Sequence, residues 1–405
     1  MQSLTDLVGS SEGRRFLTSN GVFFDPLEFK DLLRAPARTE LARSLGSDGR
    51  KLICSGQQLY VDYQRSVLNK ILMLKELEQD SDLFPFFLWV DTDRSGSDNL
   101  ITKFAWPKPS KKGPVRIAPS KTRDIEARFV RLDASQLKSA IDKLETHLRG
   151  SGIQRDGAKL KYQNLREIFI KEKVEILSAF NFRLSTFLME NHLGYFPRSA
   201  ILSEALNRGL LTEEINLILN HIDDVIRVFN ESVQSHLELG IDPHVEPRRA
   251  DYLPLFYSCD VDDHRLRLHH RVEGGDHFAV GLCSCGEDYR FFLGTNTLSI
   301  EQIAQTNRWS TDVLLPAFLN NLVSGLVAGK SSGLYMMVIN SVLRQVMGMS
   351  PVPILLPEEL DPLANLPERI DSLLYDYFNT EDEGLSQTKS IRMQETQSTT
   401  REILS

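Results

Sequence analysis

Residues 51–99 constrain the fold more than any other stretch, because they combine two buried strands with a helix between them. Leu52-Ile53-Cys54 is a short apolar run that stops at Ser55-Gly56-Gln57-Gln58, where glycine and polar residues predict a turn. A broad apolar helix face follows between Val67 and Leu77. Phe84–Val90 then runs apolar without alternation, as a strand covered on both faces must, and ends at Asp91-Thr92-Asp93.

A strand–helix–strand unit of this kind predicts a parallel strand pair in an α/β fold. The polar turn after the first strand and the carboxylates after the second then lie at the same edge of the sheet. Ligands of open α/β sheets bind at that edge. The unit therefore predicts a site for a small-molecule substrate, most simply an enzyme's.

The composition of the chain indicates which cellular compartment and which classes of partner to expect. The chain has 405 residues, 41% hydrophobic and 25% charged, which is typical of a soluble globular protein with two or three domains. A net charge of −8 disfavours nucleic acid as a partner. No apolar run is long enough to span a membrane, and the polar N-terminus lacks the layout of a signal peptide. Four cysteines without a framework spacing favour a reducing, cytoplasmic location.

Changes in pattern divide the chain into five expected segments. The strand–helix–strand unit belongs to a first part of the core, residues 1–106, and a second part of the core spans 296–379. Between them we expect a basic loop with a helical insertion at 107–250 and a small β module at 251–295, and after them a disordered tail at 380–405. The basic run Lys108–Arg123 fits either a lid over an anionic ligand or a solvated loop.

Two apolar stripes predict long amphipathic helices in the insertion. The first runs from Ile170 to Leu188 in steps of three and four, as one continuous stripe. The second runs from Ile215 to Leu237, with Thr212 as its expected N-cap.

The second half of the chain changes period twice. Residues 255–294 alternate with period two and predict short antiparallel strands. Arg308–Asp312 predicts the start of a helix, with Ser310 or Thr311 as its cap. The run Pro351–Leu356 predicts another buried strand.

Three cysteines fall inside the small β module. Cys259 follows a strand-like run, His264 lies five residues later, and Cys283 and Cys285 share a turn between two strands. Zinc takes four nitrogen or sulfur ligands from two tight turns, and a segment this small gains from a metal staple. We expect Cys259, His264, Cys283 and Cys285 to hold a structural zinc ion, although Asp260, Asp262 or Asp263 could compete as ligand. The alternative is three small buried thiols, or a ribbon that has lost its metal.

A glycine turn late in the chain offers a place for an anion. Gly329-Lys330-Ser331 precedes an apolar helix, but the spacing from Gly325 is one residue short of a P-loop, so a P-loop NTPase is excluded. A helix start with Lys330 and Ser331 could still bind a phosphate or carboxylate. An ordinary capped helix start explains the same residues.

These segments, in this order, resemble the bacillithiol synthase family, the cysteine-adding enzymes of bacillithiol biosynthesis. The resemblance rests on Ser55–Gln58, on Lys70 in the following helix, on Phe84–Trp89, on Arg308-x-Ser310-x-x-Val313-Leu314, and on the glycine turn and strand that close the core. It implies a Rossmann-like core related to class I synthetases and nucleotidyltransferases, with a helical insertion and a nucleotide-binding pocket. It also implies a reaction that joins cysteine to an amino-sugar malate conjugate.

The chain departs from the family pattern at three places. The family's acidic run with a histidine is replaced by Asp93-Arg94-Ser95-Gly96. Its late Gly-Gly-Pro-Gly-Glu turn is replaced by Ala328–Ser332. The family's C-terminal coiled coil is not reached, so a homodimer would have to form by another route.

The residues and the resemblance together predict a carbon–nitrogen ligase that uses ATP or ADP with Mg²⁺. Asp91, Asp93 and Gln57 are its expected catalytic residues, with Asp98 as a further candidate for Mg²⁺. The expected nucleotide and substrate contacts are Ser55, Gly56, Gln57, Gln58, Arg308, Ser310, Lys330 and Ser331. A non-catalytic scaffold on the same fold and an RNA-linked synthetase-like protein are the alternatives. Cys54 is expected to be a buried thiol, not a reactive one.

Overall fold

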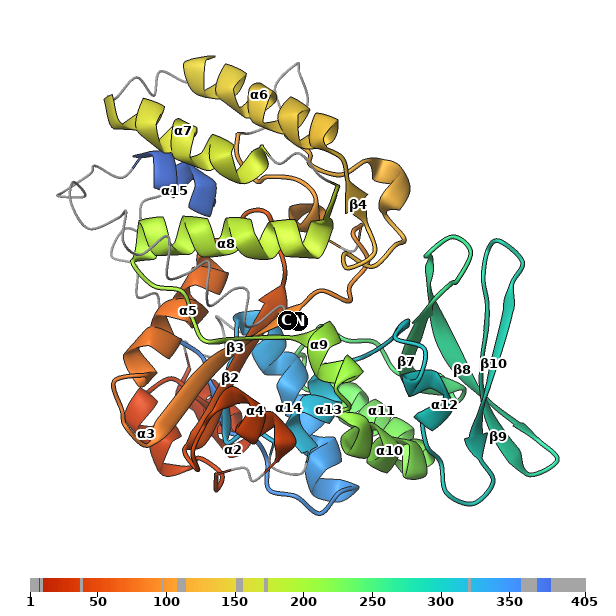
Figure 1. Ribbon diagram of the computed structural model, residues 1–405. Coiled ribbons are helices and arrows are strands. Elements are labelled where there is room, and N and C mark those ends of the chain that lie inside the picture. The colour runs from red at the N-terminus through yellow and green to blue at the C-terminus, as the bar shows by residue number, and fades with distance from the viewer. Residues whose placement is uncertain are drawn as a thin grey trace.

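A parallel sheet lies at the centre of the computed structural model (Figure 1). The structure describes residues 7, 10–36, 39–96, 98–107, 114–150, 156–170, 174–319, 322–357 and 370–379. Within them the sheet has six strands, all parallel, in the order β1-β13-β12-β2-β3-β6. Their bounds are β1 Val22–Phe23, β2 Lys51–Gln58, β3 Leu83–Val90, β6 Ser199–Ile201, β12 Gly325–Val327 and β13 Ile354–Leu355.

The predicted strand–helix–strand unit is present as β2, α5 (Arg65–Leu77) and β3. One detail of the prediction is wrong, because Ser55–Gln58 are the last four residues of β2 and not a turn. Pairing with β3 decides this, since it continues from Lys51 opposite Leu83 to Gln58 opposite Val90. Gly56 permits the close pairing, because a Cβ there would lie 2.9 Å from the carbonyl oxygen of Leu88.

Alternate side chains of the two central strands enter two separate hydrophobic cores. Cys54 and Phe86 belong to the first core, which also contains the buried face of α14 (Lys330–Gln345). Ile53 and Phe87 belong to the second core, together with α5 and α8 (Leu177–Leu193). Both faces of the sheet are therefore covered, which is why β3 contains no alternation, and Cys54 is buried as expected.

The helical insertion is more broken than the sequence predicts. The stripe from Ile170 to Leu188 is not one helix, since α7 (Asp156–Phe169) ends before it and β5 (Glu175–Ile176) precedes α8. Figure 1 shows α8, α6 (Ala134–Gly150), α7 and α15 (Leu373–Asn379) gathered at the top of the molecule. Strand β4 (Arg131–Leu132) pairs with β5 beside them. The predicted tail and Lys108–Gly113 lie outside the described residues.

The second stripe also belongs to two helices, and they pack on the core. The break is at His221, between α10 (Thr212–Asn220) and α11 (Ile222–Glu238), and Thr212 is the first residue of α10 rather than its cap. Residues of α11 and α14 share the first hydrophobic core. In the chain, β6 and then α9 (Leu202–Asn207) come before α10, and β6 forms one edge of the central sheet. The region expected to be purely helical thus contributes a core strand.

The period-two segment forms the predicted antiparallel module. Its strands are β7 (Tyr252–Ser258), β8 (Arg265–Glu273), β9 (Asp276–Leu282) and β10 (Asp288–Gly294). Within the described part of the chain the sheet order is β10-β9-β8-β7-β11, and β11 (Trp309–Thr311) is an unexpected fifth strand. Arg308–Asp312 therefore begins no helix, and Ser310 pairs with Phe256 in the sheet. Figure 1 shows the hairpins projecting from the side of the core.

The remaining described helices are short. They are α2 (Ser11–Ser19), α3 (Pro26–Asp31), α4 (Glu40–Leu45), α12 (Glu301–Ala304) and α13 (Leu314–Phe318), with 3₁₀ turns at Asn99–Ile101 and Ser120–Thr122. None of the helices in the described ranges combines the length and the apolar character needed to cross a bilayer.

Candidate functional site

A cavity of about 340 Å³ opens at the carboxyl edge of the central sheet, where the sequence places the ligand site. Of the predicted site residues, Gly56, Gln57, Gln58 and Asp93 line it. The wall also includes residues from β7, β8, the end of β11 with the residue that follows it, and the start of α14: Phe256, Arg265, Thr311, Asp312 and Ser332. The pocket thus lies between the parallel core and the antiparallel module.

One side of the pocket carries a continuous series of polar contacts, which we call the polar chain: Lys70, Gln57, Gln58, Asp93, Arg265, Glu126 and Arg128. Lys70 Nζ donates to Gln57 Oε1 at 3.1 Å, and Gln57 Nε2 donates to Gln58 Oε1 at 2.6 Å. Gln58 Nε2 then donates to Asp93 Oδ2 at 3.0 Å. The amides therefore link a buried cation to a carboxylate.

The polar chain continues into the antiparallel module. Arg265 Nη1 lies 3.2 Å from the other oxygen of Asp93, and its Nε lies 3.0 Å from Glu126 Oε1. Arg128 Nε contacts the second oxygen of Glu126 at 2.6 Å. Glu126 is fully buried, and burial raises its pKa although Arg128 and Arg265 oppose that shift. Two arginines around one buried carboxylate hold this end of the chain rigidly.

Lys70 is the buried cation of the pocket. Its Nζ donates to the carbonyl oxygen of Gly56 at 2.7 Å in addition to Gln57, and the residue is only 5% exposed. Burial lowers the pKa of Lys70 to about 8. An amine with such a pKa can bind an anion or exchange a proton near neutral pH. The same burial raises the pKa of the neighbouring Cys54 thiol to about 12, so Cys54 is no nucleophile.

Asp91 and Asp98 do not join Asp93 in one group. Asp91 is buried and accepts bonds from the backbone N–H and the hydroxyl of Ser203, in the first turn of α9. Asp98 accepts from the hydroxyl of Tyr60 at 2.8 Å and from the backbone N–H of Leu100 at 2.8 Å. Among the described residues these three aspartates form no cluster of ligand atoms that could hold a metal ion together.

The other predicted contact residues take structural positions. The Ser55 hydroxyl donates to the carbonyl oxygen of Val327 at 2.8 Å and ties β2 to β12. Ser310 is buried and donates to Glu126, so it supports the polar chain from β11. Lys330 and Ser331 begin α14, whose N-cap Gly329 supplies no side chain, and Ser332 of the same turn reaches the pocket wall.

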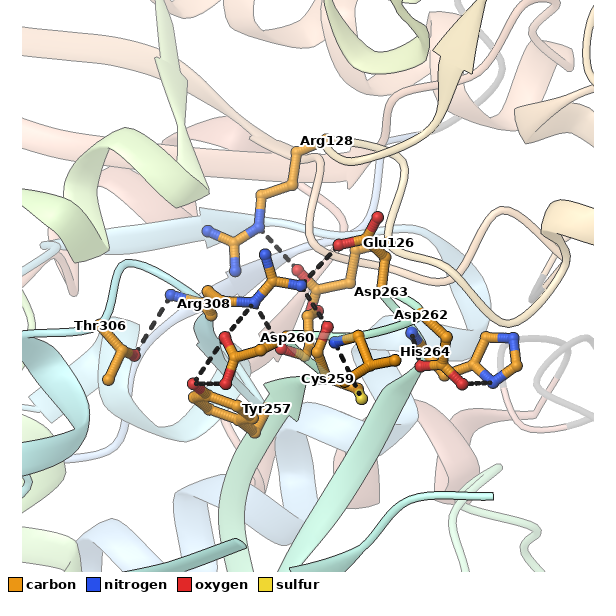
Figure 2. A network of polar contacts seen from close by, with 12 residues as sticks. Glu126, Arg128, Tyr257, Cys259, Asp260, Asp262, Asp263, His264, Thr306 and Arg308 are labelled. Carbon is orange, nitrogen blue, oxygen red and sulfur yellow. Dashed lines mark hydrogen bonds and ion pairs between the residues drawn. The ribbon is translucent and has the colours of Figure 1, made fainter. Parts of the chain in front are cut away.

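Arg308 immediately precedes β11 and contacts the turn after β7. It is not among the residues that line the pocket. Its Nε donates to the carbonyl oxygen of Ser258 at 2.7 Å, and its Nη2 donates to the carbonyl oxygen of Cys259 and to Asp263. Figure 2 shows Arg308 between the turn that begins at Cys259 and the pair Glu126–Arg128. The guanidinium therefore holds a turn of the β module in place.

The cysteines of the β module converge at the ends of two turns. Ligand atoms of Cys259, Asp262, Cys283 and Cys285 all lie within 4.8 Å of one another, an arrangement that could hold a metal ion. The two sulfurs of Cys259 and Cys285 are 3.5 Å apart, and Cys283 Sγ lies 3.4 Å from Asp262 Oδ1. The first turn is closed by the N–H of Cys259 on the carbonyl oxygen of His264 at 2.9 Å. We call these four residues the thiolate cluster.

The structure places Asp262 where the sequence suggests His264. The imidazole Nδ1 of His264 lies 3.0 Å from Asp262 Oδ2 and 3.1 Å from the Ser284 hydroxyl, so it contacts the thiolate cluster from outside. A histidine that orients a ligand carboxylate is a familiar arrangement around metals. Hydrogen bonds from the Tyr289 hydroxyl and the Val261 N–H outweigh burial and hold the pKa of the Cys259 thiol below its usual value.

Several residues of the pocket wall and of the polar chain are not among the predicted site residues. Arg265, Glu126 and Arg128 come from β8 and from a loop of the insertion, and no motif marks them. Thr92 is 1% exposed, lines the pocket, and has a hydroxyl without a hydrogen-bond partner among the described residues. The position of Thr92 in the sequence could have indicated it, since it lies between Asp91 and Asp93, two of the predicted catalytic residues.

In comparisons with known proteins, no family model matches the chain. No curated protein matches it either.

Proposed function

We propose that the pocket at the sheet edge is the active site of a carbon–nitrogen ligase that joins an amino acid to a small amine in a nucleotide-linked reaction. The observation that carries the proposal is the polar chain, because it presents a buried amine, two amides and a carboxylate to one cavity. The Thr92 hydroxyl in the same wall, which has no hydrogen-bond partner in the part of the chain that the structure describes, supports a ligand, since buried polar groups are normally satisfied. Arg265 adds a cation from the opposite module.

The proposed roles follow from charge. In such a ligase, ATP converts the carboxylate into an acyl adenylate, with release of pyrophosphate, or into an acyl phosphate, with release of ADP. The amine then attacks the acyl carbon, expels AMP or phosphate, and loses a proton. Asp93 would orient the amine and accept that proton, while Gln57 and Gln58 would donate to substrate oxygens. Lys70 and the backbone N–H groups at the start of α14, next to Lys330, would attract phosphate or carboxylate oxygens. Mg²⁺ would arrive with the nucleotide phosphates, because the described pocket offers no cluster of carboxylates.

We propose further that the chain is a divergent relative of the bacillithiol synthases. Gly56, Gln57, Gln58 and Lys70, which carry part of the resemblance, line one pocket, and this supports the proposal. The family's histidine has no counterpart in Asp93–Gly96, which favours either a different substrate or a pocket that binds without turnover. The second case is the scaffold alternative.

Mass spectrometry of reaction mixtures tests the ligase proposal. The protein would be incubated with MgATP, single amino acids including cysteine, and either an amino-sugar malate conjugate or small amines. We expect a condensation product lighter than its two substrates by one water, together with AMP or ADP. Asp93→Asn should lose the product, and Asp288→Asn, a control at an exposed position of β10, should keep it. If the protein binds nucleotide but forms no product, the ligase proposal fails and the scaffold alternative replaces it. If it neither binds nucleotide nor forms product, the ligase and the scaffold proposals are both refuted.

We propose that the thiolate cluster holds a structural Zn²⁺ ion. Three sulfurs and one carboxylate oxygen give the four ligands of a tetrahedral zinc site, and the exposed hairpins around it have little core of their own. Metal analysis of the purified protein should find about one zinc per chain. Cys283→Ser should lose most of it, and Asp288→Asn should retain it. A zinc-free wild type that does not take up added Zn²⁺ would contradict the assignment.

A further inference from the structure

We propose that the metal in the thiolate cluster positions Arg265, so that metal binding completes the ligand pocket. The inference rests on the proposed function only where it concerns a ligand. Asp262 and Arg265 are three residues apart, at the turn that leads from β7 into β8. One end of this short segment enters the thiolate cluster and the other enters the polar chain.

The segment is short and hydrogen-bonded along its length, so we expect a movement of one end to move the other. Three backbone bonds hold it: Cys259 N–H to His264 O, Asp263 N–H to Cys259 O, and Arg265 N–H to Asp124 O, at 2.9, 3.1 and 2.8 Å. Arg308 clamps the same turn through the carbonyl oxygens of Ser258 and Cys259. Asp263 has a positive φ of 60°, a conformation that a non-glycine residue keeps only when its surroundings impose it.

Arg265 is built into the pocket and is not a surface cation. Its side chain is 9% exposed, and the guanidinium carbon lies 3.6 Å from the ring centroid of Phe256, which also lines the cavity. Its two charged contacts, Asp93 and Glu126, come from the core and from the insertion. A displacement of this one side chain would therefore leave Asp93 without its cation and would loosen the contact between three parts of the chain.

The geometry of the thiolate cluster suits one bridging cation. Three sulfurs and one carboxylate oxygen, from two separate turns, converge within 4.8 Å of one another. A divalent ion bound to all four would join the two turns through four bonds. Without the ion, we expect the Cys259–His264 turn to open and Arg265 to leave its place between Asp93 and Glu126.

Hydrogen exchange followed by mass spectrometry tests this coupling without any ligand. The zinc-loaded protein, the protein after removal of zinc by a chelator, and Cys285→Ser would be compared, with Asp288→Asn as the matched control. Cys285 is the exposed member of the cluster, so its replacement disturbs packing least. We expect exchange to rise at least about tenfold for residues 259–266 and also for residues 91–96 and 124–128 when zinc is lost, and added Zn²⁺ should reverse it.

The backbone contacts explain why these distant peptides report on Arg265. The N–H groups of Ser95 and Ala127 donate to Ile125 and Asp93, so the insertion loop and the end of β3 protect each other. Strand β2 should remain protected, because its partners β3 and β12 do not involve the module. Unchanged exchange at 91–96 and 124–128, or equal loss of protection in β2, would overturn the proposal.

The proposal and the pocket function fail in different ways. If wild-type protein binds no nucleotide or amino acid, the pocket function fails, but the exchange experiment still decides the coupling. If ligands bind and zinc removal leaves their affinity unchanged, the coupling fails and the pocket function stands. Arg265→Lys should weaken ligand binding while it retains zinc, which separates the positioning residue from the metal ligands.

Discussion

Lys70 gives a stability prediction that depends only on its buried position. Burial lowers its pKa from the ordinary value of 10.5 to about 8, because the charged form loses its hydration. Between those two pH values the unfolded chain keeps a proton that the native state has released. The free energy of unfolding must therefore rise with pH in this interval. Below about pH 8 both states are charged, and the native state carries the full cost of burying the ammonium.

The magnitude follows from about 1.36 kcal/mol per pKa unit of difference. We expect the free energy of unfolding of the wild type, measured relative to Lys70→Met, to rise by about 1 kcal/mol from pH 7 to pH 9 and by about 2 kcal/mol from pH 7 to pH 10. Urea unfolding of both proteins at each pH provides the difference, and the variant cancels the titration of all other groups.

The control is Lys75→Met, which removes an exposed lysine of the same helix and should keep the wild-type pH slope. A flat difference between wild type and Lys70→Met would mean that water reaches the amine. A difference that falls with rising pH would mean that an anion stabilises the charged form, and either result would refute the description of Lys70.

Two further predictions separate structural carboxylates from functional ones. Asp62→Asn should lower the free energy of unfolding by about 1–3 kcal/mol, because the buried carboxylate accepts from the N–H groups of Tyr63, Leu374 and Ala105 and an amide nitrogen cannot. Thermal unfolding measures the loss, and an unchanged midpoint would contradict it. Asp91→Ala should cost about 1–2 kcal/mol by uncapping the first turn of α9, yet leave ligand affinity unchanged. A large loss of affinity at unchanged stability would instead return Asp91 to the catalytic group.

The sequence predicts the centre of the fold better than its edges. Phe84–Val90 is apolar on both faces and long enough to identify as a buried strand. Gly325–Val327 and Trp309–Thr311 are strands of three residues, too short to show any period, and only their partners make them strands. The break at His221 has no proline or glycine to mark it, so the apolar stripe reads as one helix.

The residues of the candidate site also differ in whether a local sequence pattern determines their position. Gln57, Gln58 and Asp93 could be predicted because parallel strands bring their carboxyl ends to one edge. Arg265 could not, because it meets Asp93 across 172 residues and no local pattern encodes that contact. The sequence does not distinguish Asp262 from His264 as the residue that joins the three cysteines, since spacing alone does not show which side chain of a turn points inward.

The most direct test of the account is thermal stabilisation of the purified protein by ATP, ADP and AMP, with and without Mg²⁺. A nucleotide at about 100 times its Kd, bound only to the native state, should add about 2.7 kcal/mol to the free energy of unfolding. We expect a clear upward shift for the wild type and for Asp288→Asn, and its loss in Lys70→Met, which removes the pocket cation assigned to the phosphates. The absence of a shift with every nucleotide would contradict the claim that the pocket at the sheet edge is a nucleotide-linked active site.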